Sequence, residues 1–232
     1  MHPIKKSAHA AGAIYLSLVL VAPFAMIYVP GKLIVHGNAA ATAENILAHE
    51  TMFRLAIFGD LIGHVIFICL GIALYRLLGR VNKTWAMLML AFVLVSAAVG
   101  FLNTLNNIAA LTLFRGGEFL DVVDKVQRDA LGFLFLRLHN QGEFIDEIFW
   151  GAWLFPFGLL VFKSGFLPRI LGVWLIVAGF AWGALSVIAQ FFPTQYSGAF
   201  AWLQPAFFAE MAMMLYFLVR GANPKMLPAL TA

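Results

Sequence analysis

Charged residues are scarce in this chain. Only 11% of its 232 residues are Asp, Glu, Lys or Arg, and 62% are hydrophobic, whereas soluble domains carry about 25% charged residues. So few charges exclude a soluble globular domain, because they could not cover a surface that faces water. A lipid bilayer as the surrounding solvent removes this difficulty. The sequence therefore indicates an integral membrane protein, with the lipid bilayer as its expected partner.

Cysteine and known catalytic motifs are also nearly absent. The single cysteine, Cys69, lies in an apolar run, so an intrachain disulfide is excluded and the redox compartment cannot be inferred. The H-E-x-x-H motif of zinc proteases is missing. Ser96 and Ser186 lie in apolar runs without a nucleophile elbow. No motif identifies an enzyme or names a cofactor, and a function without catalysis is favoured.

Basic residues exceed acidic ones, with 15 Lys and Arg against 11 Asp and Glu, a net charge of +4. A basic chain can bind nucleic acid when its cations form a stripe interleaved with exposed aromatic residues. No such stripe occurs in this sequence. We therefore expect no nucleic-acid partner. The excess of basic residues is explained instead by the way the chain crosses the membrane.

Six apolar stretches are long enough to cross a bilayer, which takes about 20 residues. They cover residues 10–29, 51–78, 85–114, 143–162, 167–192 and 200–219 approximately. We expect an all-α, polytopic helix bundle with six transmembrane helices that form a single domain over residues 1–232. The first stretch is longer than the core of a signal peptide, about 7–15 residues, so it is expected to remain as a span.

The basic residues collect on one side of this predicted topology. The N-terminus, the second and fourth connections and the C-terminus share that side, which carries no Asp or Glu. Cytoplasmic loops of membrane proteins are enriched in Lys and Arg, so both termini are expected in the cytoplasm and the chain in the inner membrane. The nine cations on that side are Lys5, Lys6, Arg76, Arg80, Lys83, Lys163, Arg169, Arg220 and Lys225.

Two longer connections lie on the opposite, outer side. Asn38 or Thr42 can cap a short Ala-rich helix that ends near His49. Residues 118–131 alternate apolar and charged positions at helical spacing, which predicts an amphipathic helix on the outer surface or packed on the bundle. The stretch from 131 to 162 would be about 48 Å long as one helix, so we expect a break or a protruding end near residues 140–142.

Glycine and proline predict local features of the spans. Pro23, Pro156 and Pro205 lie inside apolar stretches and predict kinks. Two glycine pairs spaced four apart, one at Gly59 and Gly63 and one at Gly179 and Gly183, predict close helix contacts within the chain.

Two sequence signatures resemble a known family. One is residues 37–46, GNAAATAENI, followed by Phe53-Arg54; the other is residues 148–151, IFWG, followed by SGFLPRILG at residues 164–172. Both are similar to a bacterial multi-pass membrane family catalogued as domain of unknown function 4386, and the resemblance extends from the first span to Arg220. It implies an inner-membrane protein of six or seven spans. That family has no assigned activity, so it transfers no functional residue.

Polar residues within the spans are the candidate functional residues, because an ionisable group inside a bilayer costs several kcal/mol unless it is paired or hydrated. Residues four apart, such as Asp60 and His64 or His139 and Glu143, share one helical face. All of the candidates lie in the outer half of the predicted spans. We expect an outward-facing polar cavity lined from Arg54, Asp60, Asn103, Glu143, Asp146 and Glu210. The full set of candidate ligand-binding residues is Arg54, Asp60, His64, Asn103, Asn107, His139, Glu143, Asp146, Glu147 and Glu210.

Several uses of these residues remain open. A structural use would make them helix caps and ion pairs, such as Glu50 with Arg54. Our preferred function is the binding or transport of a small polar or cationic solute, with proton coupling as one form of it. The alternatives are a metal-dependent intramembrane hydrolase at the outer leaflet and a non-catalytic sensor or scaffold subunit. For the hydrolase, the candidate zinc or iron ligands are Asp60, His64, His139 and Glu143.

Overall fold

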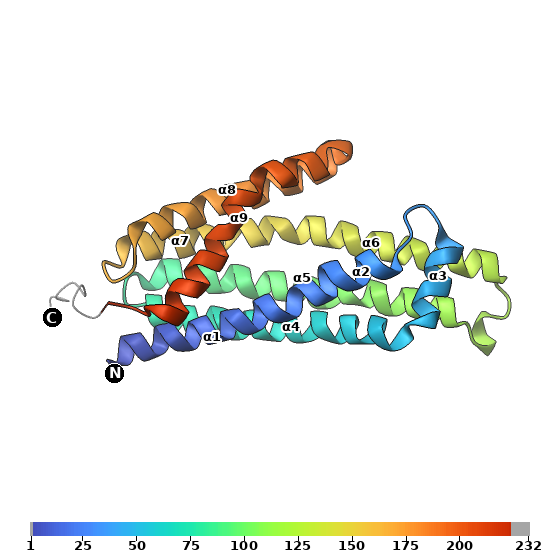
Figure 1. The fold of residues 1–232 in the computed structure, drawn as a ribbon, viewed down its shortest axis with the longest axis horizontal. Helices are drawn as coiled ribbons and strands as arrows, with labels where there is room; N and C mark the ends of the chain where they lie inside the picture. The colour runs from blue at the N-terminus through green and yellow to red at the C-terminus, as the bar shows by residue number, and fades with distance from the viewer. Residues whose placement is uncertain (1, 224–232) are drawn as a thin grey trace. The chain divides into compact units, whose positions relative to one another are not determined.

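The computed structural model describes residues 2–223, which form helices joined by short loops (Figure 1). Short irregular helical turns lie at Phe24–Tyr28 (π), Glu118–Leu120 (3-10) and Pro193–Gln195 (3-10). The α-helices are α1 (Pro3–Pro23), α2 (Val29–Leu33), α3 (Ala39–Ala48), α4 (Glu50–Leu78), α5 (Lys83–Arg115), α6 (Lys125–Ala152), α7 (Leu154–Lys163), α8 (Arg169–Phe191) and α9 (Tyr196–Val219).

Six helical segments among these residues are long and apolar enough to cross a membrane. They are Pro3–Leu33, Glu50–Leu78, Lys83–Arg115, Lys125–Lys163, Arg169–Phe191 and Pro193–Val219. The prediction of an all-α chain with six membrane-spanning helices is thereby confirmed. Which side the termini face stays a prediction, and Lys225, one of the cations behind it, lies outside the described residues.

The described chain divides into two compact units. The first unit comprises residues 2–17, 66–97 and 144–223, and the second comprises residues 18–65 and 98–143. Helices α1, α4, α5 and α6 contribute residues to both units. Each unit is therefore described by itself.

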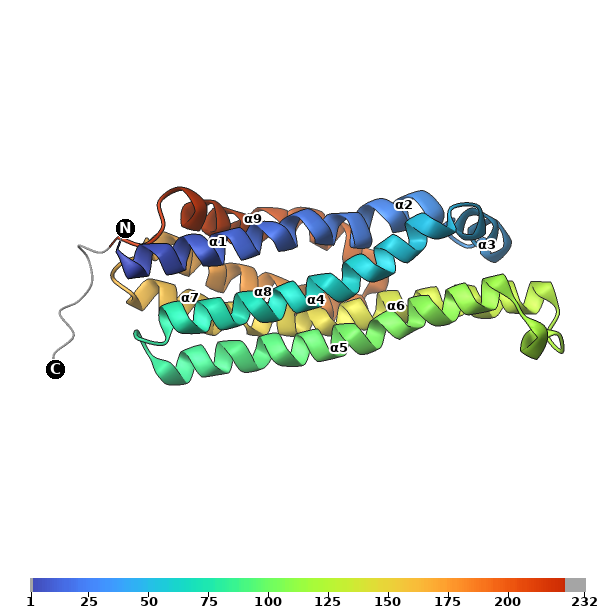
Figure 2. The ribbon, with the colours of Figure 1, turned by 90° about the horizontal axis from the view of Figure 1, so that it is seen from below.

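In the second unit, α3 connects the end of α2 to the start of α4 (Figure 2). The Asn38 side chain accepts a hydrogen bond from the Ala41 N–H at 3.0 Å, which confirms Asn38 as the helix cap. Thr42 is instead buried, and its hydroxyl accepts from the Val35 N–H. The apolar core of this unit contains Ala25, Val29, Leu33, Ala43, Ile46, Phe53, Ala56, Ile57, Ala110, Leu111, Phe114 and Leu136.

In the first unit, α8 packs against both α7 and α9. Glycines let the backbones approach closely: a Cβ on Gly158 would lie 2.5 Å from the Gly172 carbonyl oxygen, and a Cβ on Gly151 would lie 2.5 Å from that of Gly179. The close contact predicted at Gly179 is thus made within the chain. Gly183 contributes to the same contact through its backbone, because its nitrogen lies 3.1 Å from the Gly151 Cβ position. A Cβ built on Gly183 itself would meet no heavy atom within 4 Å among the described residues outside its own stretch of helix.

Helix α6 runs without interruption from Lys125 to Ala152, so of the two alternatives expected near residues 140–142 the break is wrong, and the protruding helix end stays a prediction. Gly142 serves close packing instead, because a Cβ there would lie 2.1 Å from the Asn103 side-chain oxygen. The interruption comes at Trp153, between α6 and α7. Pro156 explains why the helix is interrupted there. A proline ring clashes with the carbonyl four residues earlier, which here belongs to Ala152, the last residue of α6.

The amphipathic helix expected over residues 118–131 is split in the structure. Gly116 and Gly117 adopt positive φ angles of 69° and 155°, which end α5 and turn the chain. A 3-10 turn at Glu118–Leu120 follows, and α6 then begins at Lys125. The Asp124 side chain accepts from the Gln127 N–H at 2.9 Å, so it caps α6 and sets its start.

Candidate functional site

Two acidic side chains converge on a histidine in the second unit. The His139 Nε2 atom lies 3.5 Å from a Glu143 carboxylate oxygen and 3.9 Å from one of Asp60. His139 and Glu143 are one turn apart on α6, and Asp60 reaches them from α4. The three side chains are 13–26% exposed. We call Asp60, His139 and Glu143 the acid–histidine cluster.

The other ring nitrogen of His139 is held by α5. Nδ1 lies 3.2 Å from the carbonyl oxygen of Asn103, and the Asn103 side-chain amide donates to the His139 carbonyl at 2.8 Å. A carbonyl oxygen can only accept, so Nδ1 must carry the hydrogen of this bond. In the neutral ring, Nε2 then carries no hydrogen, and its lone pair would face the two carboxylates. That contact is favourable only when a proton lies between Nε2 and a carboxylate oxygen. The geometry therefore favours an additional proton within the cluster.

No described Lys or Arg pairs with either carboxylate of the cluster. Arg54, expected in the same cavity, pairs instead with Glu50, with a distance of 2.7 Å from Nε to the carboxylate oxygen. The i,i+4 pair of Glu50 and Arg54 is confirmed. When both carboxylates are ionised, even a protonated His139 leaves one negative charge uncompensated.

His64 lies one turn after Asp60 on α4 and fills the space that Gly100 leaves on α5. A Cβ on Gly100 would lie 2.1 Å from the His64 ring, and the imidazole and the Phe101 ring pack at 67° to each other, with 5.2 Å between ring centroids. Among residues 2–223, no group of three or more His, Cys, Asp or Glu side chains is placed to hold a metal ion. The metal-ligand role of Asp60, His64, His139 and Glu143 stays a prediction. Asn107, one turn after Asn103, is buried.

The remaining predicted acids belong to the first unit, and each has a hydrogen-bond donor there. Asp146 is buried and accepts from the Ser96 hydroxyl at 3.0 Å and from the Trp150 indole N–H at 2.9 Å. These bonds tie α6 to α5 in this unit. They give Asp146 a structural role, and its ligand role stays a prediction.

Glu147 and Glu210 each accept a short hydrogen bond from a tyrosine hydroxyl, Glu147 from Tyr196 and Glu210 from Tyr15. Sequence reasoning did not identify either tyrosine as a site residue. A phenol inside a span does need a polar partner, which was the available signal. Nothing in the spacing along one helix, however, says which acid on another helix it meets.

Comparisons with known proteins agree with the resemblance seen in the sequence. The family described as "Domain of unknown function (DUF4386)" matches residues 10–221. An uncharacterized protein of Archaeoglobus fulgidus is 33% identical over 111 residues, which are 48% of this chain and 52% of that protein. The match thus spans about half the length of that relative, and no solved structure matches the chain. Because the family match covers almost all of residues 2–223, this integral membrane protein belongs to the DUF4386 family.

Proposed function

We propose that the protein binds a small cation at the acid–histidine cluster, and that the cation exchanges there with a proton during transport. The observation that carries the proposal is the convergence of the Asp60 and Glu143 carboxylates on His139 Nε2. The histidine is already committed through Nδ1 to the Asn103 carbonyl.

Charge balance supports this proposal. An uncompensated charge is costly inside a protein and more so within a membrane span. With both carboxylates ionised, the cluster carries one negative charge in excess of its imidazolium, and a bound cation or proton would compensate it. Cation binding and protonation then compete for the same carboxylate oxygens, which is the simplest physical basis for proton coupling.

The metal-dependent hydrolase has less support from the geometry. Its four candidate ligands come from two i,i+4 pairs, but the His64 ring is packed against Phe101 and Gly100. No described group of side chains is placed as a metal site. The sensor or scaffold alternative predicts that the cluster binds nothing, so one experiment can separate the three.

Cation binding is expected to raise the melting temperature of the full chain in neutral detergent. Chloride salts of Na⁺, K⁺, methylammonium and guanidinium would be titrated at fixed pH, with N-methylglucamine chloride keeping the ionic strength constant. A cation present at 100 times its Kd stabilises the folded state by about 2.7 kcal/mol. For a chain of this size that is a rise of roughly 5–10 °C.

Matched variants decide where the cation binds. Glu143→Gln removes a charge from the cluster and should abolish most of the rise in melting temperature. Glu50→Gln should keep this rise, because Glu50 is an acid of the same unit that pairs with Arg54 instead. The proposal is wrong if none of these cations shifts the melting temperature or if Asp60→Asn/Glu143→Gln shifts as much as wild type. Stoichiometric Zn²⁺ that co-purifies and is lost in His64→Ala would favour the hydrolase instead.

We also infer from the distribution of cations that both termini face the cytoplasm, with the chain in the inner membrane. A Cys69→Ser background has no other cysteine to label. In intact cells, a membrane-impermeant maleimide should label Asp121→Cys, between α5 and α6, and not Val81→Cys, between α4 and α5. Labelling of both or of Val81→Cys alone contradicts this topology.

A further inference from the structure

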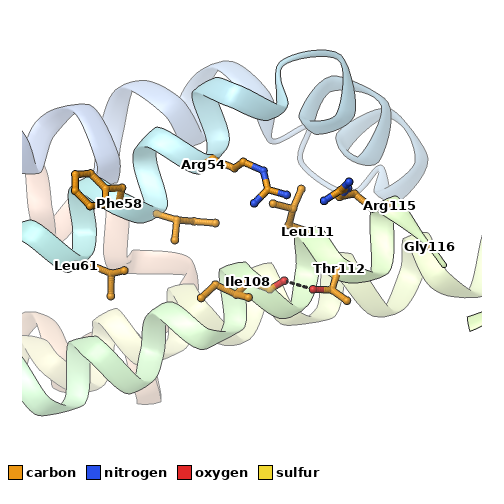
Figure 3. A pocket seen from close by; sticks show the side chains of 9 residues that line it. Arg54, Phe58, Leu61, Ile108, Leu111, Thr112, Arg115 and Gly116 are labelled. Carbon is orange, nitrogen blue, oxygen red and sulfur yellow. Dashed lines mark hydrogen bonds between the residues drawn. The ribbon is translucent and has the colours of Figure 1, made fainter. Parts of the chain in front are cut away.

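A pocket of about 440 Å³ lies between α4 and α5 in the second unit (Figure 3). Its two ends differ chemically. The guanidinium groups of Arg54 and Arg115 lie at one end, and the side chains of Phe58 and Leu61 lie at the other (Figure 3). The residues that line it are Arg54, Ile57, Phe58, Leu61, Ile108, Leu111, Thr112, Arg115 and Gly116.

The charged end of the pocket has a net positive charge. Glu50 is the only acid paired with these arginines among residues 2–223; its carboxylate oxygens lie 2.7 Å from Arg54 Nε and 3.7 Å from Arg115 Nε. Two guanidinium groups against one carboxylate leave one positive charge. The two arginine side chains are 50% and 55% exposed. Each guanidinium has five N–H donors, so both retain donors for an anion.

The apolar end faces outward from the protein. Phe58 is 59% exposed and Ile108 is 42% exposed, and both belong to segments that are apolar enough to span a membrane. Side chains so exposed on a spanning helix face lipid. The pocket is therefore open to the hydrocarbon region along its apolar part.

The two ends of the pocket lie at the depths that the headgroup and an acyl chain of a membrane lipid occupy. Arg54 is the fifth residue of α4 and Arg115 is the last residue of α5, so both lie close to helix ends on the same side of the second unit. Leu61 follows Arg54 by seven residues, or about 10 Å along the helix. A headgroup at the arginines would thus lie near the membrane interface, with an acyl chain running down toward Leu61.

We propose that this pocket binds one anionic phospholipid, with its phosphate held by Arg54 and Arg115 and one acyl chain on the apolar end. Guanidinium groups bind phosphate through charge-assisted, often bidentate hydrogen bonds. A free inorganic phosphate would leave the apolar end of the pocket unfilled, and a zwitterionic lipid would bring a cationic group toward the arginines. The proposal does not depend on the acid–histidine cluster.

The test measures lipid binding to the delipidated full chain in neutral detergent by native mass spectrometry. Phosphatidylglycerol is expected to bind at least about tenfold more tightly than phosphatidylcholine with the same acyl chains. Both lipids offer the same phosphate, but only phosphatidylcholine brings a cationic group toward two guanidinium groups that already carry a net positive charge. Arg54→Gln/Arg115→Gln should lower the affinity for phosphatidylglycerol to that for phosphatidylcholine. Arg137→Gln, which changes an exposed arginine on α6 outside the pocket, should leave it unchanged.

A second variant tests the apolar end with both arginines in place. Ile108→Trp fills this end and should also lower the affinity for phosphatidylglycerol about tenfold or more, whereas Leu102→Trp, at an exposed position of α5 outside the pocket, should not. Equal phosphatidylglycerol binding by wild type and Arg54→Gln/Arg115→Gln would overturn the proposal. Displacement of the lipid by inorganic phosphate at millimolar concentration would also overturn it, because the site would then recognise the anion alone.

Discussion

Replacing Gly158 with alanine is expected to lower the melting temperature by roughly 5–10 °C, which corresponds to about 2–3 kcal/mol of overpacking. The new Cβ would lie 2.5 Å from the carbonyl oxygen of Gly172 on α8 and 3.0 Å from the backbone nitrogen of Ile176. These are backbone atoms, so the clash cannot be relieved by rotating a side chain. Helices α7 and α8 would have to separate, and the packing along their contact would be lost.

Gly183→Ala is the matched control on α8, because the new Cβ would meet no heavy atom within 4 Å among residues 2–223 outside its own stretch of helix. Alanine exceeds glycine in helix propensity by about 1 kcal/mol, so this variant should keep or raise the melting temperature. Both variants would be compared in the same neutral detergent by following the unfolding of the full chain. An equal fall in both would show that glycine serves helix flexibility rather than close packing between α7 and α8.

The helices of this protein could be predicted from local sequence because their causes are local. An apolar run of sufficient length indicates a span wherever it occurs, and each of the six predicted spans overlaps one helical segment of that kind, with 167–192 extending one or two residues beyond Arg169–Phe191. Asn38 was predicted as a cap from its place before an Ala-rich run, and its side chain makes the expected bond to the Ala41 N–H. Neither inference requires knowing which helices are neighbours.

Contacts between helices could be predicted only in part, because a spacing within one helix does not identify its partner. The four-residue spacing of Gly179 and Gly183 predicts a close contact, but it does not show that both approach Gly151 on α6, Gly179 through its carbonyl oxygen and Gly183 through its nitrogen. Gly158 and Gly172 lie on different helices and approach each other reciprocally, a relation that no single-helix pattern contains. The same reason explains Gly142, which looked like a helix break and instead accommodates Asn103.

The sequence predicts at which depth of the span and on which helical face each candidate side chain lies, but not which side chains pair with one another. Asp60 and the pair of His139 and Glu143 were each singled out for their helical spacing, and the structure brings them together. Arg54 was expected beside them, but its nearest acid in sequence, Glu50, pairs with it. A short-range ion pair along one helix is formed whenever the helix forms, so it competes well against any longer-range partner.

His139→Ala is expected to destabilise the protein by about 2–3 kcal/mol, because it leaves two partly buried carboxylates facing each other without their partner. It also removes the donor to the Asn103 carbonyl. The side chains of the cluster are 13–26% exposed, so the expected loss of stability is slightly smaller than the loss from breaking a fully buried ion pair. His36→Ala, at an exposed loop position, should change the stability by less than about 0.5 kcal/mol.

The electrostatic part of this effect can be isolated in a double-mutant cycle with Glu143→Gln. If the Glu143 charge is what His139 compensates, His139→Ala should cost about 1 kcal/mol less in the Glu143→Gln background than in the wild type. The four proteins would be compared by denaturant or thermal unfolding in one neutral detergent at one pH. Additive effects would mean that His139 acts on stability through Asn103 and packing alone, and the acid–histidine cluster would then lack the charge coupling on which cation binding depends.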